Sequence, residues 1–242
     1  RNFSLDRENR ISLSTERTEI SLSTGRNTTT SVGDQCDIFI YDNEDEPTYE
    51  KLLSKYANNI TVIHFTGKVQ QYNAMNHFVK NYLFNSNITH VAHIDIDEFI
   101  VLKKHNNIHE FVKDYENYDA IGINWVLFGD NNLTSTSERG VLNRFTKRQN
   151  DVNPHIKTIV NPKKVNTMLV HNHIGSWVDT NYKVHNNTPF NINGSIDIAQ
   201  INHYFCKTKE EFINKRDRGR ADDGNIRDMK DFHDHNFNEI ED

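Results

Sequence analysis

The sequence predicts an α/β fold in which a doubly wound, mostly parallel sheet is followed by a smaller mixed region. Strand and helix patterns alternate from residue 37 to residue 94, which is typical of parallel strands joined by crossover helices. Beyond residue 105 the helical periodicity becomes sparse, while short apolar segments typical of strands continue. We therefore predict a domain at residues 35–222, with halves at 35–105 and 106–222, and a C-terminal tail at 223–242.

The first half is predicted to contain three strands joined by two helices. The strands are apolar segments of suitable length, and each helix carries apolar residues at helical spacing. Pro47 suits the first turn of its helix, because proline needs no hydrogen-bonded N–H there. The predicted strands are 37–41, 60–65 and 89–94, and the predicted helices are 47–57 and 71–84.

The second half is predicted to contain short strands between a few helices. Thr208 and Glu211 have the spacing of a capping box, in which the two side chains bond each other's backbone N–H groups at a helix start. The predicted strands are 120–128, 141–145, 158–160, 168–171 and 199–205, and the predicted helices are 108–115 and 207–216.

Residues 1–34 differ in composition from the rest of the chain. The segment Ile11–Thr15 recurs as Ile20–Thr24, and its alternation allows two short strands. Large apolar residues are scarce in residues 1–34, so we predict that this segment is an N-terminal arm or a peripheral segment.

Composition restricts the classes of partner. The net charge of the 242 residues is −6 without a long basic stripe, which argues against nucleic acid. No apolar segment reaches 18 residues, so we expect no membrane span in this chain. The chain starts at Arg1 without a secretory pattern, consistent with a part of a longer multi-domain protein. Cys36 and Cys206 have no metal-binding spacing and are predicted to be buried free thiols, which favours the cytoplasm.

The strongest functional signal is the segment Ile94-Asp95-Ile96-Asp97-Glu98-Phe99. Residues i and i+2 of a strand point to the same side, so Asp95 and Asp97 can face one ligand. Two close carboxylates repel each other unless a cation lies between them, and a hard divalent ion such as Mn²⁺ or Mg²⁺ suits oxygen ligands. Such an ion takes its remaining ligands from a substrate's phosphates, which indicates a nucleotide-dependent enzyme.

Five motifs, in this order, carry a resemblance to a known family. They are Ile40-Tyr41-Asp42-Asn43, Gln71-Tyr72-Asn73-Ala74-Met75-Asn76, the Asp-x-Asp-Glu-Phe segment at 95–99, Trp125-Val126-Leu127-Phe128-Gly129, and Ile201-Asn202-His203-Tyr204 followed by the basic helix to Arg218. The segment 157–162 with His171 fits more weakly. Together the motifs resemble GT-A fold glycosyltransferases of the family-2-like and family-92-like group, over about residues 37–222. The group opens with an Asn-Glu strand that residues 1–34 do not show.

The resemblance implies a glycosyltransferase that moves a hexosyl or deoxyhexosyl group, with inversion, from a nucleotide-sugar donor to a glycan, glycoprotein or other hydroxyl acceptor. It implies Mn²⁺ or Mg²⁺ bound by Asp95, Asp97 and His203. Trp125 and Glu98 are the expected acceptor contacts, with core packing as the equal alternative for Trp125 and support of the metal site as the alternative for Glu98. The expected nucleotide-sugar contacts are Asp42, Asn43, Gln71, Asn76, Asp95 and Arg218, the last chosen from several basic residues that could neutralise phosphate.

An inverting transfer needs a general base for the acceptor hydroxyl. Asp179, in a loop-like stretch, and Asp130, after Phe128-Gly129, are the candidates. Three other functions remain open. A nucleotidyltransferase would show a glycine-rich loop after the first strand, and an Asp-x-Asp phosphatase would continue with Gly-Thr or a similar pair. An inactive carbohydrate-binding module would not hydrolyse a nucleotide sugar.

Overall fold

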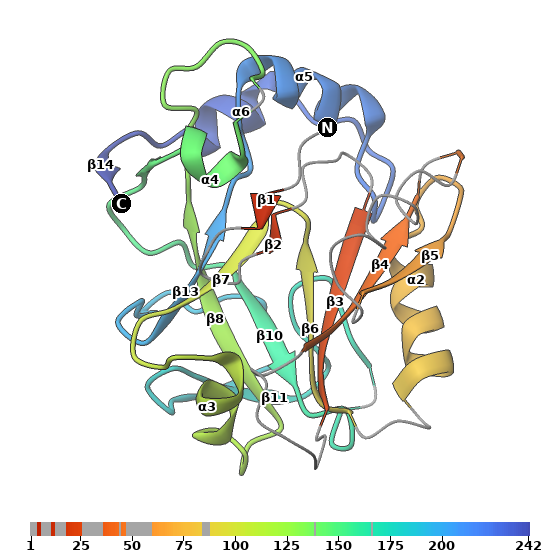
Figure 1. Ribbon diagram of the computed structural model, residues 1–242. Coiled ribbons are helices and arrows are strands. Elements are labelled where there is room, and N and C mark those ends of the chain that lie inside the picture. The colour runs from red at the N-terminus through yellow and green to blue at the C-terminus, as the bar shows by residue number, and fades with distance from the viewer. Residues whose placement is uncertain are drawn as a thin grey trace.

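The computed structural model describes residues 4–5, 11–12, 18–25, 36–43, 45–46, 60–83, 88–137, 139–165 and 167–242. A ten-stranded sheet lies at the centre, with short helices around it (Figure 1). Its main path is β12-β11-β8-β10-β6-β3-β4-β5, and β13 pairs with both β8 and β7. The strands of this sheet are β3 Thr18–Gly25, β4 Cys36–Asp42, β5 Ile60–His64, β6 Ile88–Asp95, β7 Glu98–Leu102, β8 Ala120–Leu127, β10 Ile156–Val160, β11 Ser176–Asp179, β12 Val184–Asn186 and β13 Ala199–His203.

The sheet is mixed, which corrects the prediction of a mostly parallel, doubly wound sheet. Among the described strands, only the pairs β4–β5, β8–β11 and β8–β13 are parallel. β3 lies between β4 and β6, antiparallel to both, and β10 lies between β6 and β8 in the same way. β4 and β5 are paired in parallel, as expected of strands that follow each other in the chain, but β3 separates β4 from β6.

The strand Thr18–Gly25 shows where part of the predicted N-terminal arm lies. Ile20 lies opposite Ile40 of β4 on one side and opposite Ile94 of β6 on the other. This part of the arm therefore lies inside the sheet rather than at its periphery. Two further short strands, β1 Ser4–Leu5 and β2 Ile11–Ser12, pair with each other.

Several predicted elements are confirmed, some with shifted ends. The helix α2, Gln71–Phe78, continues as a π-helix at Val79–Leu83, and it buries Gln71, Ala74, Met75 and Phe78, the spacing of a helix with one apolar face. The helix α5, Lys209–Arg218, starts at the predicted Thr208–Glu211 capping box. The other helices are α3 Ile108–Lys113, α4 Val141–Arg144 and α6 Met229–His235, and the strands β9 Lys147–Arg148 and β14 Ile240–Glu241 pair with each other.

Two predicted strands are wrong. Residues 141–145 contain α4, because Val141, Arg144 and Phe145 are buried at the i, i+3, i+4 spacing of one helical turn. Residues 168–171 form no strand and contribute only an isolated bridge between Met168 and His173. The helix predicted at 47–57 lies outside the described residues.

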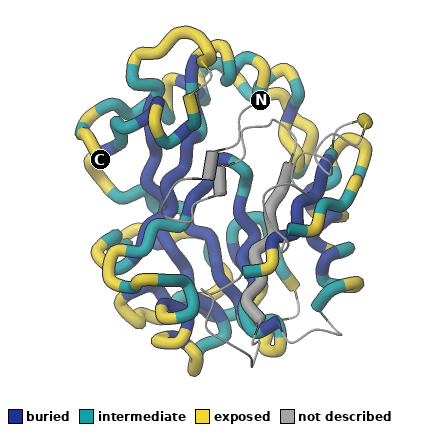
Figure 2. The backbone as a smooth tube through the Cα atoms, viewed as in Figure 1, coloured by how far each residue is buried: buried dark blue, intermediate teal, exposed yellow. Residues whose placement is uncertain are grey.

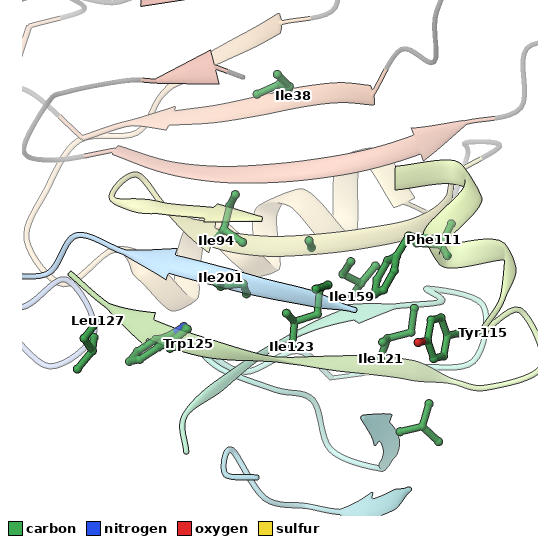
Figure 3. Packing of buried hydrophobic residues seen from close by; sticks show 14 of the residues in the cluster. Ile38, Ile94, Phe111, Tyr115, Ile121, Ile123, Trp125, Leu127, Ile159 and Ile201 are labelled. Carbon is green, nitrogen blue, oxygen red and sulfur yellow. The ribbon is translucent and has the colours of Figure 1, made fainter. Parts of the chain in front are cut away.

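The main core lies against one face of the sheet. Buried residues follow the strands, while exposed residues gather on loops and outer helix faces (Figure 2). Alternate residues of β8, namely Ile121, Ile123, Trp125 and Leu127, extend along this core (Figure 3). Phe111 of α3 lies at one end and Trp125 near the other, so the core continues to the end of β8 that faces the site described next. Among the described residues, no helix combines the length and apolar character needed to cross a membrane.

Candidate active site

The predicted carboxylates lie where β6 turns into β7. Asp95 is the last residue of β6, Asp97 lies in the two-residue turn, and Glu98 starts β7. The backbone N–H of Asp95 donates to Glu98 Oε2 at 2.9 Å, which closes the turn. The side chain of Asp95 is 32% exposed, whereas those of Asp97 and Glu98 are buried. Asp95 is thus the carboxylate of this turn that faces outward.

Strand β13 brings His203 to the same turn. β13 is antiparallel to β7, and its last residue, His203, lies opposite Glu98. His203 Nε2 is 3.6 Å from Asp97 Oδ1, and His203 Nδ1 is 3.9 Å from Glu98 Oε1. The backbone N–H of Tyr204 donates to the carbonyl of Asp97 at 2.9 Å, which fixes the turn to the end of β13. The structure therefore brings together the three residues expected to bind the metal.

Two lysines supply positive charge to the cluster. Lys157 of β10 places its buried Nζ 3.3 Å from Asp95 Oδ2 and 3.5 Å from Glu98 Oε2, and donates to the carbonyl of Val170 at 2.8 Å. Lys215 of α5 donates to Asp97 Oδ2 at 2.7 Å. Neither lysine was among the assigned site residues, although Lys157 belonged to a weak motif and Lys215 to the basic helix. Strand β10 and helix α5 are distant in sequence from the carboxylates at 95–98, so only the fold reveals that these lysines pair with them.

These charges shift the pKa values of the acids in different directions. Burial acts to raise the pKa of Asp97, but Lys215 and the nearby His203, 3.6 Å away, outweigh burial and hold it well below its ordinary range. For Asp95, burial is likewise outweighed, mainly by Lys157, and the pKa is lowered. Burial raises the pKa of Glu98 well above its ordinary range, and burial lowers the pKa of His203. Asp95 and Asp97 are therefore anionic near neutral pH, and His203 is a neutral imidazole able to act as a ligand.

Aromatic rings surround Trp125 beside this cluster. Its ring centroid lies 4.3 Å from that of His203, 4.9 Å from that of His155 in a stacked arrangement, and 5.1 Å from that of His171. The indole N–H is buried and finds no hydrogen-bond partner among the described residues. Burial, with Lys157 second, lowers the pKa of His171 to about 4. Trp125 thus lies next to His203, and His155 and His171 extend the aromatic surface.

Of the two expected acceptor contacts, Glu98 is the less accessible. Its side chain is fully enclosed and bonds the backbone of Asp95. This favours the alternative role, in which Glu98 supports the turn that carries Asp97.

The expected nucleotide-sugar residues lie at several distances from the cluster. Gln71 Nε2 donates to Asp95 Oδ1 at 3.4 Å, so the start of α2 lies at the site. Asn43 donates to the carbonyls of Phe65 and Gly67, both at 2.7 Å, and thereby holds the end of β4 to the loop after β5. Asp42 is buried, Asn76 is exposed on α2, and Arg218 ends α5. Arg227 also senses the cluster: burial lowers the pKa of this arginine, while the charges of Asp97 and Asp95 act in the opposite direction. Arg227 lies in the C-terminal tail at 223–242, for which the sequence predicted no site residue.

The two candidate bases are held in local hydrogen-bond networks. Asp179 ends β11, where Oδ1 accepts from the backbone of Asn181 and Lys183, and Oδ2 accepts from His185 at 3.1 Å and Asn191 at 3.3 Å. These contacts anchor the β11–β12 turn.

Asp130 follows β8, where its Oδ1 accepts from the backbone of Asn132 at 2.8 Å and from the side chain of Asn238 at 3.0 Å. Its contacts tie the loop after β8 to the C-terminal segment. The described geometry therefore shows a local structural role for each of the two acids.

The side chains of Asp95, Asp97 and His203 offer oxygen and nitrogen donors to a divalent ion. Within the described part of the chain, no three histidine, cysteine or acidic side chains stand ready as a metal site. The chemistry nevertheless fits, because two anionic carboxylates and a neutral imidazole, whose Nε2 lies 3.6 Å from Asp97 Oδ1, suit Mn²⁺ or Mg²⁺. Asp97 would have to release Lys215 for the three side chains to converge on one ion.

A comparison with known protein families identifies the family of the chain. A sequence model described as glycosyltransferase family 92 matches residues 37–239. Searches of curated proteins and of solved structures gave no match. The matched region runs from β4 to the segment after α6 and contains every residue of the cluster. Because it covers most of the chain, the chain belongs to glycosyltransferase family 92 and is a glycosyltransferase.

Proposed function

We propose that the protein transfers a hexosyl or deoxyhexosyl group from a nucleotide-sugar donor to a hydroxyl of a glycan or glycoprotein, with inversion and with Mn²⁺ or Mg²⁺. One observation carries the proposal: Asp95, Asp97 and His203 meet at one turn, beside two lysine ammonium groups, in a chain of this family. Carboxylates that bind a cation and ammonium groups that pair with phosphate are the groups that a sugar diphosphate requires.

The protein's own residues have distinct tasks in this reaction. Asp95, Asp97 and His203 would hold the divalent ion, which when bound supplies Lewis-acid stabilisation to the leaving diphosphate. Lys157 fixes the orientation of Asp95, since it bonds both that carboxylate and the carbonyl of Val170. Glu98 fixes the turn through its bond to the Asp95 backbone. The Trp125 ring lies next to His203 and is 7% exposed, so it would meet the acceptor sugar only along that exposed part.

Inversion requires a base that takes the proton of the acceptor hydroxyl. Asp179 and Asp130 remain the proposed candidates. The variants Asp179→Asn and Asp130→Asn each preserve an oxygen for local hydrogen bonds while removing the base. The residue whose variant lowers kcat by at least about 100-fold without changing donor affinity is the base.

The metal-dependent function is tested by screening nucleotide sugars for thermal stabilisation with and without Mn²⁺, because a ligand that binds only the folded state raises its apparent stability. We expect one donor to stabilise the wild type only with Mn²⁺, and Asp97→Asn to abolish this effect and turnover. Asp119→Asn, at a side chain that is 46% exposed, is the matched control and should behave as wild type.

Three outcomes would oppose the proposal. Unchanged Mn²⁺-dependent donor binding and turnover in Asp97→Asn would exclude the metal site. Donor binding without transfer or hydrolysis would indicate a binding module. Release of pyrophosphate from a nucleoside triphosphate and a sugar phosphate would indicate a nucleotidyltransferase.

A further inference from the structure

The ammonium group of Lys215 occupies a well-defined position on Asp97. Its Nζ donates to Asp97 Oδ2 at 2.7 Å and to the carbonyl of Phe205 at 3.2 Å, and it lies 4.3 Å from the centroid of the Phe205 ring. A carboxylate, a carbonyl and a ring face are the groups that attract a cation. Lys215 is thus bound as a cationic ligand would be, on the carboxylate proposed to bind the metal.

The position is suited to a cation that can leave. Lysine is a compact charge on a flexible four-carbon chain, unlike arginine, whose planar group binds in a fixed orientation. Lys215 lies in the last turn of α5, and its side chain keeps 14% of its surface exposed. It can therefore exchange Asp97 for another anion nearby without a change in the helix.

Charge balance gives the reason for such an exchange. In the structure, Asp95 and Asp97 face the ammonium groups of Lys157 and Lys215, so two carboxylates are already balanced by two cations. A divalent ion added to this set meets like charge from both lysines. The diphosphate of a donor brings negative charge that a displaced ammonium group can bind.

We propose that Lys215 is an exchangeable cation: it pairs with Asp97 in the free enzyme, competes there with the divalent ion, and pairs with the donor's diphosphate once the ion has taken Asp97. This inference rests on the proposed function and adds to it a reason why metal and donor bind together. Lys215 acts here as a residue that sets the order of ligand binding.

The test measures two ligands separately on the full chain. The affinity for Mn²⁺ alone is followed by the electron paramagnetic resonance of the free ion, and the affinity for inorganic pyrophosphate alone is followed by calorimetry in the presence of a chelator. Lys215→Met should bind Mn²⁺ at least about five-fold more tightly than the wild type and pyrophosphate at least about five-fold more weakly. Lys209→Met, at an exposed lysine in the same helix, should change neither affinity by more than about two-fold.

The opposite signs separate this role from a structural one, since a damaged site would bind both ligands more weakly. Lys215→Gln removes the charge but keeps a hydrogen-bond donor, and it should show the same pair of changes if Lys215→Met folds poorly. Unchanged or weaker Mn²⁺ binding, or unchanged pyrophosphate binding, in a folded variant overturns the inference.

The variant Asp97→Asn distinguishes this inference from the proposed metal site. If it loses the Mn²⁺ binding of the wild type, the metal site stands even when Lys215 plays no part. If neither the wild type nor the Lys215 variants bind Mn²⁺, both proposals fail.

Discussion

Glu98 and His203 face each other across the antiparallel pair of β7 and β13, with 3.9 Å between Glu98 Oε1 and His203 Nδ1. The pairing joins two motifs that are more than a hundred residues apart. Because β13 also pairs with β8, the same strand positions His203 beside Trp125. The register of β13 thus determines which carboxylates and which aromatic ring the histidine meets.

The first prediction concerns Glu98, whose two carboxylate oxygens have different surroundings. Oε2 accepts from the backbone of Asp95, while Oε1 is buried and finds no hydrogen-bond partner among the described residues. Glu98→Gln retains the accepting oxygen and should change the free energy of unfolding by less than about 1 kcal/mol. Glu98→Ala leaves a cavity and an unsatisfied N–H, and should cost about 3 kcal/mol. Urea unfolding measures both, and equal losses would contradict the assigned contacts.

The second prediction concerns the buried ammonium group of Lys157. Lys157→Met removes the partner of Asp95 and Glu98 and the donor to the Val170 carbonyl. Loss of one partner from a buried ion pair should lower the free energy of unfolding by about 3 kcal/mol. Lys164→Met, at a side chain that is 37% exposed, should cost less than about 1 kcal/mol. Both losses are measured by urea unfolding. A similar loss of stability in the two variants would show that burial of the Lys157 ion pair does not determine how much it stabilises the fold.

The sequence predicted the parts of the site that lie within single motifs. The strand before Asp95 and the capping box at Thr208–Glu211 follow from local pattern, and both are present. Asp97, however, lies in a turn rather than in the strand, so the i, i+2 argument for a shared face does not apply as made. The two acids come together because β7 folds back at once after β6.

The contacts that depend on distant segments could not be predicted in the same way. A lysine in a strand or helix pattern carries no signal for its partner, so the pairing of Lys157 with Asp95 and of Lys215 with Asp97 follows only from the fold. The weak alternation at residues 20–24 likewise gave no indication that this segment separates β4 from β6. Alternation of apolar and polar residues predicts a strand, but which strands pair in the sheet depends on contacts between distant segments of the chain.

The third prediction concerns the two cysteines, neither of which forms a disulfide. Cys206 is buried, its thiol donates to the carbonyl of Phe232 at 3.4 Å, and burial raises its pKa to about 12. Because the thiolate is the reactive form, Cys206 should resist iodoacetamide at pH 8 in the folded protein, while the partly exposed Cys36 is labelled first. Peptide mass spectrometry before and after unfolding in urea measures this order. Labelling of Cys206 at the rate found in urea would refute the buried environment.

The fourth prediction concerns the close contact between Gly122 of β8 and Trp177 of β11. A Cβ atom on Gly122 would lie 2.4 Å from two carbons of the Trp177 ring, closer than side chains pack. Gly122→Ala should therefore cost at least about 2 kcal/mol in urea unfolding. The cost should be smaller when the same change is made in a Trp177→Leu background, because the ring that obstructs the new methyl group is absent. Equal costs in the two backgrounds would mean that the strain arises elsewhere.

The last prediction concerns the ion pair that attaches α4 to the start of α5. Arg144 donates through two nitrogens to the two oxygens of Glu211, both at 2.8 Å, and Thr208 also bonds this carboxylate. Burial acts to raise the pKa of Glu211, but the hydrogen bonds from Arg144 and Thr208 outweigh it, so the pKa lies below its ordinary value of 4.5.

A depressed pKa means that the folded state favours the charged carboxylate. The resulting stability is complete above pH 4.5 and is lost as the pH falls through the lower pKa of the folded state. Glu211→Gln should thus be less stable than the wild type by about 2 kcal/mol near pH 7, and the difference should shrink below pH 4.5. Glu116→Gln, at an exposed glutamate, controls for general acid effects. Urea unfolding from pH 3 to pH 7 measures the difference in the free energy of unfolding between Glu211→Gln and the wild type. A constant difference over this range would show that the stabilisation by the Arg144–Glu211 pair does not depend on the charge of the carboxylate.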